Sequence, residues 1–166
     1  MAPKEVFTSS SEETTQFGRA IAAGLVAPVL VLLKGDLGAG KTTLAKGIIN
    51  GLGVAAEDDV TSPTFNLVHV FQSRGPSPLK VYHVDLYRLE GTHDLEAIAM
   101  EDLLAEPAVV IVEWSERLTL RSDWPVVRIE FEHGGGDKRR IRISGLDSLT
   151  ASFRPNAPET LSKKAT

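Results

Sequence analysis

The sequence predicts an α/β fold, in which a mixed, mainly parallel sheet lies in a three-layer arrangement and ends in a C-terminal antiparallel hairpin. Three observations support this prediction. Apolar runs typical of buried strands alternate with segments of helical spacing along most of the chain. A glycine-rich loop joins the first long apolar run to a helical segment. Near the C-terminus, two stretches of alternating apolar and polar residues flank a second glycine-rich turn, which is typical of a hairpin.

The N-terminal elements begin with a helix. Ser10 and Glu13 have the spacing of a capping box, which predicts that this helix starts at about Ser11. Val6 and Phe7, ahead of it, are only a short apolar start. The elements predicted here are a helix over about 11–25, a buried strand over 29–33 and a helix over 42–52.

The remaining elements alternate between strands and one helix. They are strands over 64–72 and 80–87, a helix over 94–105, a strand over 108–114, and hairpin strands over 126–132 and 138–144. The run AVVIVEW is continuously apolar up to its end, which suits a strand covered on both faces.

Size and charge limit the kind of protein. The 166 residues suit a single domain over 1–150, followed by a polar, proline-containing tail over 151–166 that we expect to be disordered. With 18 basic and 22 acidic side chains, the formal net charge is −4, so the overall field does not attract a phosphate backbone. Tight, direct binding to nucleic acid is therefore not expected.

The cellular location is predicted from two further features. The chain has no cysteine, which excludes disulfides and thiolate sites and fits a reducing compartment. The apolar stretch from Ala20 to Leu33 is too short to span a membrane and is interrupted by Gly24 and Pro28. With no targeting segment visible, we expect a cytoplasmic protein.

The most informative motif is GDLGAGKT, from Gly35 to Thr42, which matches the pattern G-x-x-x-x-G-K-[ST]. It follows the apolar strand and precedes a helix, which is the context that a phosphate-binding loop requires. In such loops the backbone N–H groups hold phosphate oxygens, the lysine, here Lys41, reaches the β/γ-phosphates, and the hydroxyl of Thr42 binds Mg²⁺. The sequence thus predicts a P-loop NTPase-like domain.

Such a loop needs a carboxylate at the end of a neighbouring strand, because Mg²⁺ prefers oxygen ligands. Asp85 and Glu113 both end apolar strands and are both candidates. Thr64, in the segment TSPTF, stands where a switch threonine would contact the Mg²⁺ and γ-phosphate region. The residues alone leave open which carboxylate binds metal and which orients water.

Several other site types are disfavoured. The guanine-binding pattern Asn-Lys-x-Asp is absent, and DLYR after the 80–85 run lacks the glycine of a GTPase Asp-x-x-Gly motif. The four histidines lack metal-ligand spacing, so a zinc site is not expected. A basic cluster at 138–142 suits a solvated strand edge, although one of its arginines can approach phosphate or base.

The motifs GDLGAGKTT, SPTF, YHVDLYRL and VEW occur here in one order and spacing. In this respect the chain closely resembles the bacterial TsaE (YjeE) family, from about Val6 to Ser144. The resemblance implies a slow, Mg²⁺-dependent ATPase that acts on a heterodimer of TsaB and TsaD. It also implies a role in forming the threonylcarbamoyl modification of adenosine 37 in tRNAs that read codons beginning with A, with tRNA contacted only through the complex.

The resemblance also implies roles for individual residues. Catalytic roles fall on Lys41, Asp85, Glu113 and Thr64, and the Mg²⁺ ligands on Thr42, Asp85 and Glu113. Contacts with ATP fall on Ser9, Ser11, Leu37, Gly38, Ala39, Gly40, Lys41, Thr42, Thr43 and Arg140.

Two alternatives to a regulatory ATPase remain. One is an assembly module in which ATP binding matters and hydrolysis only resets the complex. The other is a small-molecule kinase, which would need an arginine-rich lid and an acceptor pocket, whereas the segments between the predicted elements are short. The sequence does not fix whether the protein self-associates.

Overall fold

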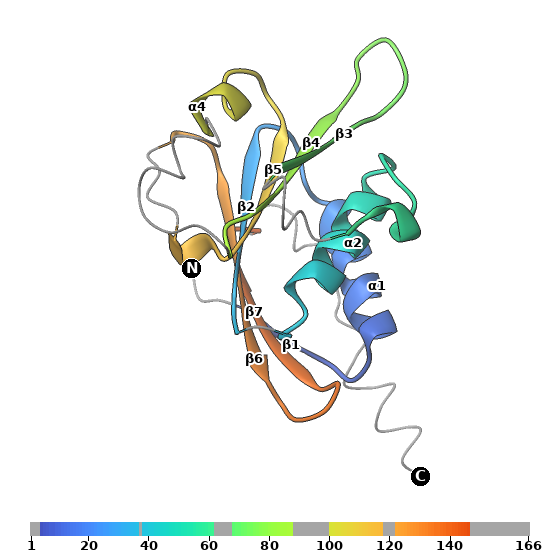
Figure 1. The fold of residues 1–166 in the computed structure, drawn as a ribbon, viewed down its shortest axis with the longest axis vertical. Coiled ribbons are helices and arrows are strands. Elements are labelled where there is room, and N and C mark those ends of the chain that lie inside the picture. The colour runs from blue at the N-terminus through green and yellow to red at the C-terminus, as the bar shows by residue number, and fades with distance from the viewer. Residues whose placement is uncertain (1–3, 37, 62–67, 88–99, 118–121, 147–166) are drawn as a thin grey trace.

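The computed structural model describes residues 4–36, 38–61, 68–87, 100–117 and 122–146. Within these residues a seven-stranded sheet has the order β1-β7-β6-β2-β5-β4-β3 (Figure 1). The strands are β1 (Lys4–Thr8), β2 (Val29–Lys34), β3 (Val68–Gln72), β4 (Lys80–Asp85), β5 (Val109–Glu113), β6 (Val126–His133) and β7 (Arg139–Ser144). The helices are α1 (Ser11–Ala22), α2 (Lys41–Gly51) and α4 (Met100–Leu103), with 3₁₀ turns η1 (Glu57–Asp59) and η2 (Ser115–Arg117).

The sheet is mixed, as predicted, but parallel pairing is confined to its centre. Strands β6, β2, β5 and β4 are parallel neighbours, whereas β3, β7 and β1 are each added antiparallel. The predicted hairpin of β6 and β7 is confirmed. The prediction of a mainly parallel sheet holds only for the central strands, and β1 was missed because its pairing partner β7 lies at the other end of the chain.

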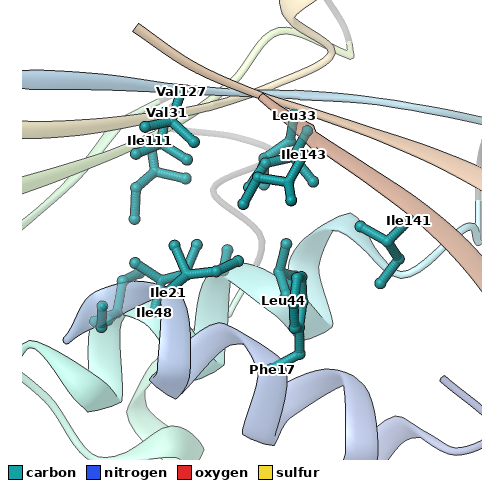
Figure 2. Packing of buried hydrophobic residues seen from close by; sticks show 14 of the residues in the cluster. Phe17, Ile21, Val31, Leu33, Leu44, Ile48, Ile111, Val127, Ile141 and Ile143 are labelled. Atoms are coloured by element: carbon teal, nitrogen blue, oxygen red, sulfur yellow. The ribbon is translucent and has the colours of Figure 1, made fainter. Parts of the chain in front are cut away.

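The two strands at the centre of the sheet, β2 and β5, are apolar up to their last residue because both faces of the sheet are covered there. Helices α1 and α2 lie on one face and contribute Phe17, Ile21, Leu44 and Ile48 to its core (Figure 2). Helix α4 lies toward the other face, where Met100 joins a second buried cluster (Figure 1). Continuous burial explains why β5 reads as an unbroken apolar run up to its last residue.

Helices α1 and α2 touch through their backbones. A Cβ added at Gly47 would lie 2.1 Å from the Thr15 carbonyl oxygen, and one at Gly18 would lie 2.5 Å from the Leu44 carbonyl oxygen. Neither distance is possible for real atoms, so both positions require glycine. This close contact fixes α2, and with it the loop before it, against the rest of the fold.

The start of α1 has the predicted cap at Ser10 and Glu13, with the return hydrogen bond one residue ahead of the N-cap. The Ser10 hydroxyl accepts a hydrogen bond from the Glu13 N–H at 3.1 Å, and the Glu13 carboxylate accepts one from the Ser9 N–H at 2.6 Å. The helix begins at Ser11, as predicted, and ends at Ala22, before the expected end.

The outer strands β1, β7 and β6 carry charged residues on the face away from α1 and α2. Arg140 pairs there with Glu5 at 2.5 Å and with Glu132 at 3.5 Å, and Arg142 pairs with Glu5 at 3.3 Å. An antiparallel sheet with one solvated face shows this alternation. Among the described residues, no helix is long and apolar enough to cross a membrane.

Some predictions lie outside the described residues. These are the start of the strand over 64–72, the start of the helix over 94–105, the tail over 151–166, and the site residues Leu37 and Thr64.

Candidate phosphate-binding site

The predicted loop lies between β2 and α2 and depends on glycine. Gly38 and Gly40 have φ values of 77° and 105°, in the left-handed region that residues with a Cβ rarely adopt. Gly40 is the N-cap of α2, whose first turn holds no acidic residue and no side-chain cap. At this N-terminus the backbone N–H groups of Lys41, Thr42 and Thr43 have no acceptor within the helix. The terminus is therefore suited to binding an anion.

Lys41 lies inside the loop. Its side chain is 4% exposed, and its Nζ donates to the carbonyl oxygens of Gly35 at 2.5 Å and Asp36 at 2.7 Å. The Nζ also lies 4.0 Å from the centre of the Trp114 ring, at cation–π distance. Burial lowers the pKa of Lys41, and nearby carboxylates, Glu113 foremost, oppose that shift.

The two predicted carboxylates are neighbours. Asp85 and Glu113 are register partners at the carboxyl ends of the parallel strands β4 and β5, and both are buried. Glu113 Oε1 accepts a hydrogen bond from the Thr42 hydroxyl at 2.7 Å, across to the first turn of α2. Asp85 Oδ1 accepts one from the Tyr87 N–H at 2.9 Å. The loop, the hydroxyl and both carboxylates are thus gathered at one end of the parallel strands.

Sequence reasoning gave His83 no role, yet it belongs to this cluster. Its ring is fully buried, and Nε2 lies 2.5 Å from Glu113 Oε2, so Glu113 is held between His83 and Thr42. The available signal was the spacing of His83 and Asp85, because residues two apart on a strand share a face.

Arg139, and not Arg140, approaches the loop. The Arg139 guanidinium donates to the carbonyl oxygens of Gly38 at 3.1 Å and Gly136 at 2.6 Å. Arg140 points to the opposite face of β7, toward Glu5. The structure therefore does not bring Arg140 to the loop.

The serines predicted to contact nucleotide lie at the same end of the sheet. Thr8, at the end of β1, is the register partner of Arg139, and Ser9 and Ser11 follow it. Ser9 is half-buried and donates its N–H to Glu13, and Ser11 is exposed at the start of α1. Ala39 is buried in the core beneath the loop, and Thr43 is half-buried in the first turn of α2.

One aromatic ring lies beside Lys41, and a second lies against the first. Trp114 directly follows β5 with φ of 61°, an uncommon conformation for a residue other than glycine. This backbone turn accompanies a Trp114 ring that lies beside Lys41 and 5.0 Å from the ring centre of Tyr87. Tyr87 was predicted as part of a strand, but β4 ends at Asp85.

The donor set suits Mg²⁺ bound together with a phosphate ligand. Within the described ranges, no group of three or more His, Cys, Asp or Glu side chains could hold a metal alone. Mg²⁺ typically uses one or two carboxylates, several waters and substrate phosphates, and Thr42, Glu113 and Asp85 offer oxygen ligands of that kind. The residues therefore fit a metal that arrives with a nucleotide.

The fold and the loop define the class: an α/β protein with a glycine-rich strand–loop–helix turn of the P-loop pattern at the carboxyl end of its parallel strands. A sequence profile described as threonylcarbamoyl adenosine biosynthesis protein TsaE matches residues 8–141. The chain belongs to the TsaE family.

Individual relatives agree with this assignment. The chain is 40% identical to a tRNA threonylcarbamoyladenosine biosynthesis protein TsaE from Streptomyces coelicolor over 142 residues, 82% of this chain and 93% of the relative. It is 35% identical to one from Nostoc sp. over 143 residues, 84% of this chain and 85% of the relative. Its structure is similar to that of YdiB from Bacillus subtilis, with a TM-score of 0.61, 26% identity and coverage of 100% of this chain and 99% of YdiB.

Proposed function

We propose that this protein binds ATP with Mg²⁺ at the loop before α2, hydrolyses it slowly, and acts on a complex of TsaB and TsaD. Through that complex it would serve the threonylcarbamoyl modification of adenosine 37 in tRNAs that read codons beginning with A. The relatives are named for tRNA threonylcarbamoyladenosine biosynthesis, which supports this pathway. The formal charge of −4 favours contact with tRNA only through partners, and we propose a cytoplasmic location.

The observation that carries the ATP proposal is the hydrogen bond from Thr42 to Glu113. It joins the hydroxyl of the phosphate-binding loop to a buried carboxylate on the neighbouring strand, at 2.7 Å. A purely structural glycine turn would not require a buried anion beside its lysine. The arrangement instead gives Mg²⁺ the hydroxyl and carboxylate ligands that it uses beside phosphates.

The residues divide the work. The N–H groups at the start of α2 and the Lys41 ammonium would bind phosphate oxygens, after Lys41 leaves the carbonyl oxygens of Gly35 and Asp36. Thr42 and Glu113 would hold Mg²⁺, which when bound neutralises charge on the β- and γ-phosphates. Asp85, one strand further along, would orient water. We also propose that Thr64 acts as a switch threonine that contacts the Mg²⁺ and γ-phosphate region.

Slow turnover follows from how the cations are held. Lys41 donates to loop carbonyl oxygens, and the Arg139 guanidinium does the same beside the loop. Lys41 would leave these oxygens for the phosphates, whereas Arg139 would stay on the loop carbonyl oxygen, so we propose that the TsaB–TsaD complex supplies the charge missing at the transferring phosphoryl group. This would make hydrolysis dependent on partners.

A steady-state ATPase assay tests the proposal. We expect Mg²⁺-dependent hydrolysis that is slow alone and at least about tenfold faster with TsaB and TsaD, as when a missing catalytic group is supplied. Thr42→Val should remove hydrolysis because it loses the hydroxyl at the metal position. Thr15→Val, a buried threonine on α1, is the matched control and should keep it. Equal and rapid rates with and without the partners would contradict the proposal.

A further inference from the structure

His83 is a buried polar residue. Apolar packing does not explain its burial, and the phosphate-binding loop pattern gives it no role. Its side chain is completely buried in β4, where its neighbours Val81 and Val84 are apolar. A valine or isoleucine would fill such a position without a desolvation cost, which a buried imidazole must recover through hydrogen bonds. Among the described residues, Glu113 lies within hydrogen-bond distance of its ring, at Nε2.

The contact continues a hydrogen bond from α2. Glu113 Oε1 accepts a hydrogen bond from the Thr42 hydroxyl, and the other oxygen, Oε2, lies 2.5 Å from His83 Nε2. In the arrangement in which Glu113 accepts both hydrogen bonds, His83 Nε2 carries the proton. The three side chains form one chain of hydrogen bonds from α2 through β5 to β4.

Each link fixes the next. A glutamate side chain has three rotatable bonds, so Thr42 alone does not determine the plane of its carboxylate. With His83 holding Oε2, the remaining oxygen is directed at the first turn of α2. Residues that orient metal ligands in this way commonly change metal affinity or activity by about 10- to 100-fold when removed.

We propose that His83 is a positioning residue: it holds Glu113 in the orientation that presents the carboxylate to Thr42 and to the Mg²⁺ of the nucleotide. This inference rests on the proposed function for the presence of Mg²⁺ and ATP. The two hydrogen bonds that join Thr42, Glu113 and His83, by contrast, exist without either ligand. It gives the inference a test that needs no catalysis.

That test is an NMR measurement on the full chain without nucleotide or metal. We expect a downfield His83 Nε2–H resonance that shifts in Thr42→Val, because the loss of one hydrogen bond to Glu113 changes the other. Thr15→Val should leave the resonance unchanged. An unprotonated Nε2, or a resonance that ignores Thr42→Val, would overturn the proposal.

The second test separates positioning from packing. His83→Gln keeps an N–H donor that can reach Glu113, whereas His83→Leu fills the space without a donor. In His83→Leu the Mg²⁺ concentration for half-maximal ATP hydrolysis should rise about tenfold or more, with metal-free ATP affinity within about threefold of wild type. His83→Gln should restore most of the Mg²⁺ response.

The outcomes are distinguishable. Equal Mg²⁺ responses in His83→Leu and wild type would overturn the proposal, and so would equal losses in both variants, which indicate a packing role. If His83→Leu does not fold, the NMR shift and the His83→Gln response still decide. If the wild-type protein does not bind ATP, the proposed function fails, whereas the coupling from Thr42 to His83 is still measured.

Discussion

At the residue scale, the site is a set of buried charges that compensate one another. Lys41 lies between carbonyl oxygens and the Trp114 ring, and Glu113 lies between a hydroxyl and an imidazole. Buried charges are tolerated only when hydrogen-bonded and paired. Lys41, whose pKa is lowered by burial, lies with the buried carboxylates Glu113 and Asp85 at one end of the sheet, and a buried group with a perturbed pKa in such a place is a candidate functional residue.

Arg139 provides a prediction at this scale. Arg139→Gln removes the guanidinium that contacts the loop through Gly38, so ATP affinity should fall by about 10- to 100-fold, the range for one charge-assisted hydrogen bond. Arg142→Gln, on the opposite face of the same strand, is the matched control and should leave affinity unchanged. Titration with a fluorescent ATP analogue measures both. If ATP affinity fell in Arg140→Gln but not in Arg139→Gln, Arg140 would be the ATP contact and this prediction would be wrong.

The sequence alone did not determine whether Arg139 or Arg140 faces the loop. Adjacent residues on a strand point to opposite faces, so an error of one residue reverses the assignment. Which residues of β7 share a face could be inferred from Ile141 and Ile143. Both are buried toward α1 and α2, so Arg139, two residues before Ile141, lies on that face. The spacing of His83 and Asp85 placed both on one face of a strand, but that Glu113 is the partner of His83 depends on the pairing of β4 with β5.

At the element scale, the sequence predicted the features that depend only on neighbouring residues. The capping box at Ser10 and Glu13 and the glycines before α2 were read correctly, since their hydrogen bonds and dihedral angles involve neighbouring residues. Strand β1 was missed, because five residues with only two buried side chains become a strand only by pairing with β7. Long-range pairing is the information that a single sequence carries least clearly.

The contact of α1 with α2 gives a prediction for stability. Gly47→Ala would place a Cβ 2.1 Å from the Thr15 carbonyl oxygen, so the helices must separate, and the free energy of unfolding should fall by about 1–3 kcal/mol or more. Chemical denaturation measures the change. Gln16→Ala, exposed on α1, is the control and should change the free energy by less than about 0.5 kcal/mol. An unchanged midpoint for Gly47→Ala would contradict the close backbone contact.

At the scale of the whole molecule, the two parts of the sheet have different surroundings. The parallel centre is covered on both faces and brings the loop, Asp85 and Glu113 to one end, as ligand sites in open α/β sheets require. The antiparallel strands β1, β7 and β6 have a charged face, with Arg140 and Glu5 paired across it. On the other face of β7, Arg139 contacts the loop through the carbonyl oxygen of Gly38. The sequence predicted the central part well because continuous apolar runs identify it.

The central claim is that ATP hydrolysis at this site serves the turnover of a partner complex. The most direct measurement counts modified tRNA per TsaB–TsaD complex when the wild-type protein is replaced by Glu113→Gln, with ATP binding checked in parallel. We expect Glu113→Gln to bind ATP within about threefold of wild type, because lysine and loop contacts remain. Modification should then stop after about one tRNA per complex, the result for a blocked reset step. Continued modification at the wild-type rate by a variant shown not to hydrolyse ATP would contradict the claim.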